Sequence, residues 1–173
     1  MRVGILTGGG DCPGLNAVIR AVVKVGARTF GNEHVGILHG WRGLLEAEAE
    51  PLGLADVSGI LGRGGTILKS SRTNPFRDAE SINAALDGFR RLGLDALVAI
   101  GGEDTLGAAN RLHSEHGLPV VGVPKTIDND IVLTDCSPGF GSAAKYVAAS
   151  TLEIAHEVAA IASSSTRIYV LEV

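Results

Sequence analysis

The sequence has few of the features that mark secreted, membrane-embedded or nucleic-acid-binding proteins. Cys12 and Cys136 are two cysteines far apart, which indicates neither a disulfide framework nor a zinc site. Uncharged apolar runs reach about ten residues, well short of the ~20 that a membrane-spanning helix needs. Basic residues form no run or stripe, so the electrostatic footprint of nucleic-acid binding is missing. Gly8–Gly10 interrupts the first apolar run before it can form a signal-peptide core. These absences predict a cytoplasmic globular protein with no membrane or nucleic-acid partner.

What the sequence does contain is apolar residues and glycine. Of 173 residues, 45% are apolar and 24 are glycine, and 15 basic against 19 acidic residues give a net charge of −4. High apolar content with a small charge imbalance excludes intrinsic disorder. The length suits one domain, or one lobe of a larger protein.

Short β-rich runs alternate with segments of helical periodicity, and glycine clusters stand at the joints. Strands are expected at residues 2–7, 35–38, 96–100 and 119–123, and helices at 16–27, 79–92, 104–116 and 142–161. A loop is expected around Trp41 at residues 40–43, and a glycine loop with a short strand inside it at 62–72. A final β-rich run is expected at 167–173, whereas residues 51–61 show no clear pattern. This alternation predicts an α/β fold with a mostly parallel, doubly wound sheet and helices on both faces.

In such sheets ligands bind where the strands end, so the turns after the strands are the candidate sites. Gly8–Gly14 follows a strand and opens a helix, which is the context of an anion site built from backbone N–H groups. The turn lacks the dinucleotide fingerprint, because Pro13 stands at the third glycine position, and no Walker motif is present. A tight turn without a ligand remains an alternative.

Two further turns carry ionisable groups. Gly101–Thr105 presents Glu103 and Asp104 behind a double glycine, which suits Mg²⁺ facing a phosphate, although helix capping also explains one acid. Pro124–Asp130 follows a buried strand; in it Asp128 is a candidate general base and Lys125 a candidate charge on a phosphoryl group. A plain Asp–Asn–Asp turn is the alternative for that loop.

Five motifs, in order and spacing, resemble those of the phosphofructokinases. They are GGGDCPG at 8–14, RGG at 63–65, SSR at 70–72, GGEDT at 101–105 and PKTIDND at 124–130. The resemblance runs from Met1 to Val173 and implies the first lobe of a two-lobed α/β enzyme, with residues 1–173 stopping before the second lobe. The enzyme is then expected to phosphorylate fructose 6-phosphate with Mg²⁺ as a homo-oligomer, and this chain alone to be inactive or nearly so.

The resemblance also implies roles for single residues. The phosphoryl donor would be bound by Gly10, Arg72, Thr73, Gly102, Asp104 and Thr105, with Glu103 holding Mg²⁺. The sugar phosphate would be bound by Thr126, Asp128 and Arg167, the last reaching a neighbouring subunit's substrate. Asp128, Lys125 and Asp104 form the implied catalytic set, and Asp130 matches a second loop aspartate that supports the site.

Asp104 and Lys125 bear on the choice of donor. ATP-using members of the family typically have glycine where Asp104 stands, and a carboxylate there would crowd and repel an α-phosphate. Lys125 would compensate charge on a departing phosphate, and residues 134–146 also resemble the pyrophosphate-dependent branch. Pyrophosphate is therefore the expected donor, with ATP as the alternative. A noncatalytic phosphate- or nucleotide-binding module and, more weakly, a dinucleotide-binding dehydrogenase domain are the other open functions.

Overall fold

The computed structural model describes residues 1–161 and residue 170, and within them it contains one five-stranded sheet. The strands are β1 (Arg2–Thr7), β2 (Glu33–Ile37), β3 (Ala49–Pro51), β4 (Ala96–Gly101) and β5 (Val120–Pro124). Their order across the sheet is β3-β2-β1-β4-β5, and every neighbouring pair is parallel except β2 and β3. The predicted mostly parallel α/β fold is confirmed.

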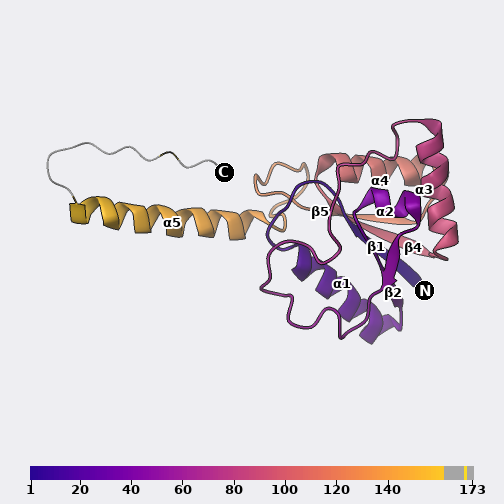
Figure 1. The fold of residues 1–173 in the computed structure, drawn as a ribbon, viewed down its shortest axis with the longest axis horizontal. Coiled ribbons are helices and arrows are strands. Elements are labelled where there is room, and N and C mark those ends of the chain that lie inside the picture. The colour runs from indigo at the N-terminus through magenta and orange to yellow at the C-terminus, as the bar shows by residue number, and fades with distance from the viewer. Residues whose placement is uncertain (162–169, 171–173) are drawn as a thin grey trace.

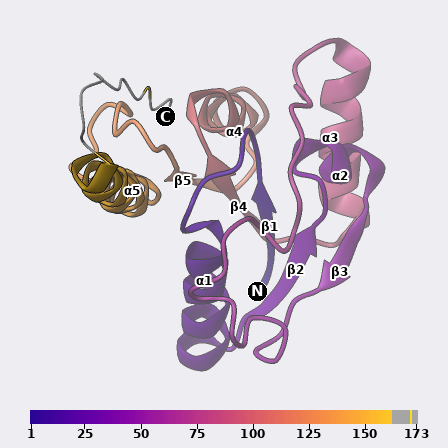
Figure 2. The same cartoon turned by 60° about the vertical axis from the view of Figure 1, so that its left-hand side comes forward.

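Helices cover both faces of this sheet (Figure 2). They are α1 (Leu15–Phe30) on one face and α2 (Trp41–Glu46), α3 (Ala79–Arg91) and α4 (Glu103–His116) on the other, whereas a fifth helix, α5 (Phe140–Ile161), covers neither face. Because successive strand residues point to opposite faces, Ile5 packs in the cluster of α1, whereas Leu6 packs in the cluster of α2, α3 and α4. The two apolar clusters therefore hold the central strand β1 between two layers of helix.

Two local predictions are wrong, and one strand was missed. Residues 40–43 are not a simple loop, because α2 begins at Trp41, and β3 was not predicted at all. Both elements are very short, and β3 ends in a proline at the sheet edge, so neither shows periodicity. Residues 62–72 contain no strand, since their backbone is held by side chains of neighbouring segments instead of by another strand.

The segment without a clear pattern completes the core on the α1 face. Leu52, Val57 and Ile60 are buried there against α1. Arg20 of α1 also donates a 2.8 Å hydrogen bond to the carbonyl oxygen of Val57. The segment is thus a covering layer made of irregular backbone, which explains why periodicity did not reveal it.

Helix α5 projects away from the sheet and its covering helices (Figure 1). Its apolar side chains are largely in solvent; Tyr146 is 76% and Leu152 58% exposed. No described helix is long and apolar enough to cross a membrane. The β-rich run expected at 167–173 lies outside the described residues, Val170 excepted.

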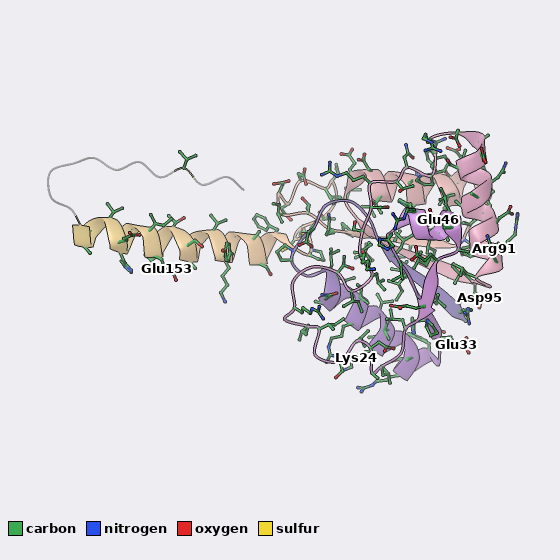
Figure 3. All side chains as sticks on the ribbon, in the orientation of Figure 1. Lys24, Glu33, Glu46, Arg91, Asp95 and Glu153 are labelled. Carbon is green, nitrogen blue, oxygen red and sulfur yellow. The ribbon has the colours of Figure 1, made fainter. Side chains whose placement is uncertain are left out.

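The opposite end of the sheet, where the strands begin, is closed by charged groups. Arg2 donates its backbone N–H to Asp95 at 2.7 Å, and its guanidinium pairs with Glu33 at 3.3 Å. Glu33 and Asp95 are labelled in Figure 3 at the side of the molecule away from α5. Gly10, Glu103 and Asp128, by contrast, lie in the segments that follow the other ends of β1, β4 and β5.

Candidate functional site

The turns after β1, β4 and β5 meet at one edge of the sheet. The backbone N–H of Gly8 donates to the carbonyl oxygen of Ile100 at 2.9 Å, and that of Lys125 donates to Gly101 at 3.0 Å. These bonds continue the parallel ladders β1–β4 and β4–β5 past their last paired residues. Three predicted motifs far apart in the sequence are therefore neighbours in space.

Lys125 lies beneath the glycine turn. Its side chain is only 7% exposed, and Nζ donates a 2.7 Å hydrogen bond to the carbonyl oxygen of Gly10. A Cβ added to Gly9 would lie 3.6 Å from Nζ, so the ammonium group is close to Gly9 as well as to Gly10. The turn after β1 thus carries a fixed positive charge.

The start of α4 brings the two predicted carboxylates to the same edge. Glu103 and Asp104 are exposed in the first turn of this helix, whereas Thr105 is buried. A Cβ on either Gly8 or Gly101 would come within 2.5 Å of the Thr105 side chain. Glycine at these two positions therefore lets the strand ends approach the helix start closely.

Arg72 and Thr73 reach the site on a segment that side chains hold in place. Asn16 is buried in α1, where its amide donates to the carbonyl oxygens of Arg63 and Gly64 at 3.0 and 3.2 Å and its oxygen accepts from Ile67 N–H at 2.8 Å. Further on, Thr7 bonds the carbonyl oxygen of Lys69, Ser70 bonds that of Gly9, and Ser71 bonds that of His39. The segment is fastened to α1, β1 and the turn before α2.

The loop after β5 is ordered by its own side chains. The Thr126 hydroxyl donates to Asp130 at 2.8 Å and accepts from the backbone N–H of Asp128 at 3.0 Å. Asn129, at φ 54°, bonds Asp135 and Ser137. The Asp128 carboxylate is exposed and has no hydrogen bond or ion pair to another described side chain or backbone group.

Two cavities at this edge divide the predicted residues into two sets. A cavity of about 790 Å³ is lined by Gly10, Arg72, Thr73, Gly102, Glu103, Asp104, Thr105 and Lys125, together with residues without an assigned role such as Trp41, Phe76 and Arg111. A second, of about 550 Å³, is lined by Thr126, Asp128, Asp130 and Lys125, together with Asp11 and Cys12. Gly102, Glu103, Gly107 and Lys125 border both. Arg167 lies outside the described residues.

Several lining residues carry no role in the sequence prediction. Trp41 was the expected centre of a loop, and nothing in its local pattern places it beside Arg72. Arg111 stacks over the ring of Phe76 at 3.9 Å from the centroid and also bonds Glu115 at 2.7 Å. Burial raises the pKa of the Cys12 thiol, despite the opposing Lys125 charge, so this thiol stays neutral. Only the tertiary arrangement identifies these residues as neighbours of the site.

The phosphofructokinase family model matches residues 2–173. A pyrophosphate–fructose 6-phosphate 1-phosphotransferase from Streptomyces coelicolor is 52% identical over all 173 residues, and an ATP-dependent 6-phosphofructokinase from the same organism is 51% identical. In both cases the chain spans 49% of the relative's length. The crystal structure of a pyrophosphate-dependent phosphofructokinase from Nitrosospira multiformis matches 95% of this chain and 44% of its own, with a TM-score of 0.84 and 27% identity. The chain belongs to the phosphofructokinase family.

Proposed function

We propose that this chain supplies the donor site and the catalytic base of a pyrophosphate-dependent fructose 6-phosphate 1-phosphotransferase. The observation that carries the proposal is the meeting of two cavities at Lys125 and Glu103. The residues expected to bind the donor line one cavity, and Thr126 and Asp128 line the other. A phosphoryl group passing between two substrates needs such a shared border.

The chemistry follows from the groups at that border. The 1-hydroxyl oxygen of the sugar attacks the nearer phosphorus of pyrophosphate, and Asp128 takes the hydroxyl proton. The bond from that phosphorus to the bridging oxygen breaks, and the second phosphate departs. Lys125 offsets negative charge on the reacting and departing oxygens. Phosphoryl transfer depends mainly on positioning and charge neutralisation, and the Thr126–Asp130 hydrogen bond fixes the loop that carries the base.

Glu103 is the proposed Mg²⁺ ligand. Its carboxylate is exposed and borders both cavities, whereas the described residues contain no group of three or more His, Cys, Asp or Glu side chains that could hold a metal alone. One protein carboxylate fits Mg²⁺, which completes its shell with phosphate oxygens and water. When bound, the ion would neutralise charge on the donor's oxygens.

Pyrophosphate is the proposed donor because Asp104 lines the donor cavity, where its carboxylate would crowd and repel an α-phosphate. ATP remains the second candidate, since an ATP-dependent relative is almost as similar to this chain as the pyrophosphate-dependent one. Homo-oligomerisation, with Arg167 serving a neighbouring subunit, belongs to the same proposal. A noncatalytic binding module would bind the donor without turning over fructose 6-phosphate.

The test is Asp128→Asn in a protein that continues this chain to the length of its relatives. Removing a general base lowers kcat by ~10²–10⁴-fold, and KM for fructose 6-phosphate should stay near its original value. Asp135→Asn is the matched control, because this exposed aspartate lies a few residues away and lines neither cavity. Unchanged turnover in Asp128→Asn would rule out the assigned base, and absence of turnover in the unmodified protein would favour the binding module.

A further inference from the structure

Asn129 stands next to the proposed base in the chain and has a left-handed backbone, with φ at 54°. Residues other than glycine seldom adopt this conformation, although asparagine tolerates it better than most. Such backbone persists only where surrounding contacts enforce it. The turn that carries Asp128 therefore needs contacts that hold it.

The Asn129 side chain supplies two such contacts, both to a segment that follows the loop. Its Nδ2 donates to the carbonyl oxygen of Asp135 at 3.1 Å, and its Oδ1 accepts from the backbone N–H of Ser137 at 3.0 Å. The two bonds use both the donor and the acceptor of the amide, as a backbone peptide group would. Aspartate at this position would lack the donor, and glycine would lack both groups.

The segment that Asn129 holds is itself anchored in the protein. Ser137 is only 2% exposed. One residue further on, the carbonyl oxygen of Pro138 accepts from the backbone N–H of Thr126 at 3.3 Å. The segment is thus attached to the base loop at Thr126 and again at Asn129. Asp128 lies between these two attachments.

These attachments fix the backbone of Asp128 and leave its carboxylate unbonded. The backbone N–H of Asp128 donates to the Thr126 hydroxyl at 3.0 Å, whereas no described group bonds the carboxylate. Asp128 lines the cavity of about 550 Å³, as do Thr126 and Asp130, but Asn129 does not. Any effect of Asn129 on the reaction must therefore pass through its neighbours.

We propose that Asn129 is a positioning residue whose two hydrogen bonds hold Asp128 where its carboxylate can take the proton of the sugar's 1-hydroxyl group. A general base works only within hydrogen-bond reach of the proton that it takes, and a misplacement of about 1 Å can lower the rate ~10²-fold. The proposal rests on the proposed function, because it needs Asp128 to be the base. Loss of the two bonds should lower kcat and leave the binding of fructose 6-phosphate nearly unchanged.

The test is Asn129→Gly, made both alone and together with Asp128→Asn, in a protein that continues this chain to the length of its relatives. Glycine keeps the left-handed backbone and removes both hydrogen bonds. Alone, the substitution should lower kcat ~10- to 100-fold with little change in KM for fructose 6-phosphate. Added to Asp128→Asn, it should lower kcat no further, because no base is left to position. The control is Asn32→Gly, between α1 and β2 and lining neither cavity, which should leave kcat unchanged.

A folded Asn129→Gly variant with the original kcat overturns the proposal, and so does an equal loss of kcat with and without Asp128→Asn, which is the mark of a purely structural role. If Asp128→Asn itself keeps full turnover, the proposed base and this inference both fail. Circular dichroism melts establish which variants fold. If Asn129→Gly does not fold, Asn129→Asp takes its place in the same comparison, because it keeps the acceptor for Ser137 and loses the donor. If neither variant folds, Asn129 serves stability and its positioning role is overturned.

Discussion

The Lys125 ammonium group and the Gly10 carbonyl oxygen are joined by a 2.7 Å hydrogen bond between residues 115 positions apart. This contact fixes a cation under the glycine turn before any substrate arrives. A charge held in place does not have to reorganise as the reaction proceeds, which is the main way that enzymes stabilise developing charge.

Under the proposed function, replacing Asp104 by glycine in a protein that continues this chain to the length of its relatives should admit ATP and lower the efficiency with pyrophosphate. The substitution removes a carboxylate from the donor cavity and leaves less negative charge near Lys125. Adding Lys125→Gly should weaken the pyrophosphate reaction further. Each effect is expected at ~10²–10³-fold in kcat/KM, as for one removed electrostatic contact, measured with both donors in all four proteins. An unmodified enzyme that already prefers ATP would refute the role of Asp104.

The Glu103→Gln variant should need more Mg²⁺ to reach half-maximal activity. The amide keeps the size of the side chain but loses the charge that attracts a divalent cation. Activity measured against Mg²⁺ concentration checks this, with Glu80→Gln as control, since Glu80 is in the first turn of α3 and lines neither cavity. If the Glu103 variant and the unmodified protein depend on Mg²⁺ concentration in the same way, Glu103 does not bind the metal and only caps the start of α4.

Stability should fall as the pH drops below about 6.5, because His34 is 6% exposed in β2 and its pKa is lowered by burial and by the nearby N-terminal charge. As the pH falls, His34 takes up a proton in the unfolded chain before it does so in the folded protein. The contribution of neutral His34 to the free energy of unfolding is therefore complete above the pKa of the unfolded chain, and it is lost as the pH falls through the pKa of the folded protein. Urea titrations between pH 5 and 8 measure this. A His34→Gln variant should show a weaker dependence, and an equal slope in that variant would contradict the assignment.

The isolated chain should self-associate through α5 and the loop before it. Val132 is 83% exposed and Leu152 58% exposed, and α5 has one lysine and two glutamates among 22 residues. Exposed apolar surface of this kind favours association. Light scattering should give a mass above 17.8 kDa, which Leu152→Glu lowers and Val25→Glu, at a similarly exposed position on α1, does not. A monodisperse monomer would contradict the prediction.

The fold was predictable wherever elements were long enough to show a period. The sequence predicted strands β1, β4 and β5 and helices α1, α3 and α4 within a few residues of their bounds. The order of the motifs also pointed to the phosphofructokinase family, which the family match confirms. The alternative of a dehydrogenase domain is therefore wrong. Elements fixed by tertiary contacts were not predictable. The path of residues 62–72 depends on Asn16 and Thr7, and the place of Trp41 depends on a left-handed turn at His39.

The long reach of the site's contacts also bears on how the chain folds during synthesis. β1 pairs with β2, which follows it closely in the sequence, but its other side pairs with β4, some 90 residues further on, and β5 pairs with β4. Pairings between distant residues are slow because chain entropy is lost before contacts compensate for it. Lys125 is made after β1, β2, β3, β4 and β5, so a nascent chain that ends before it has the glycine turn without its cation.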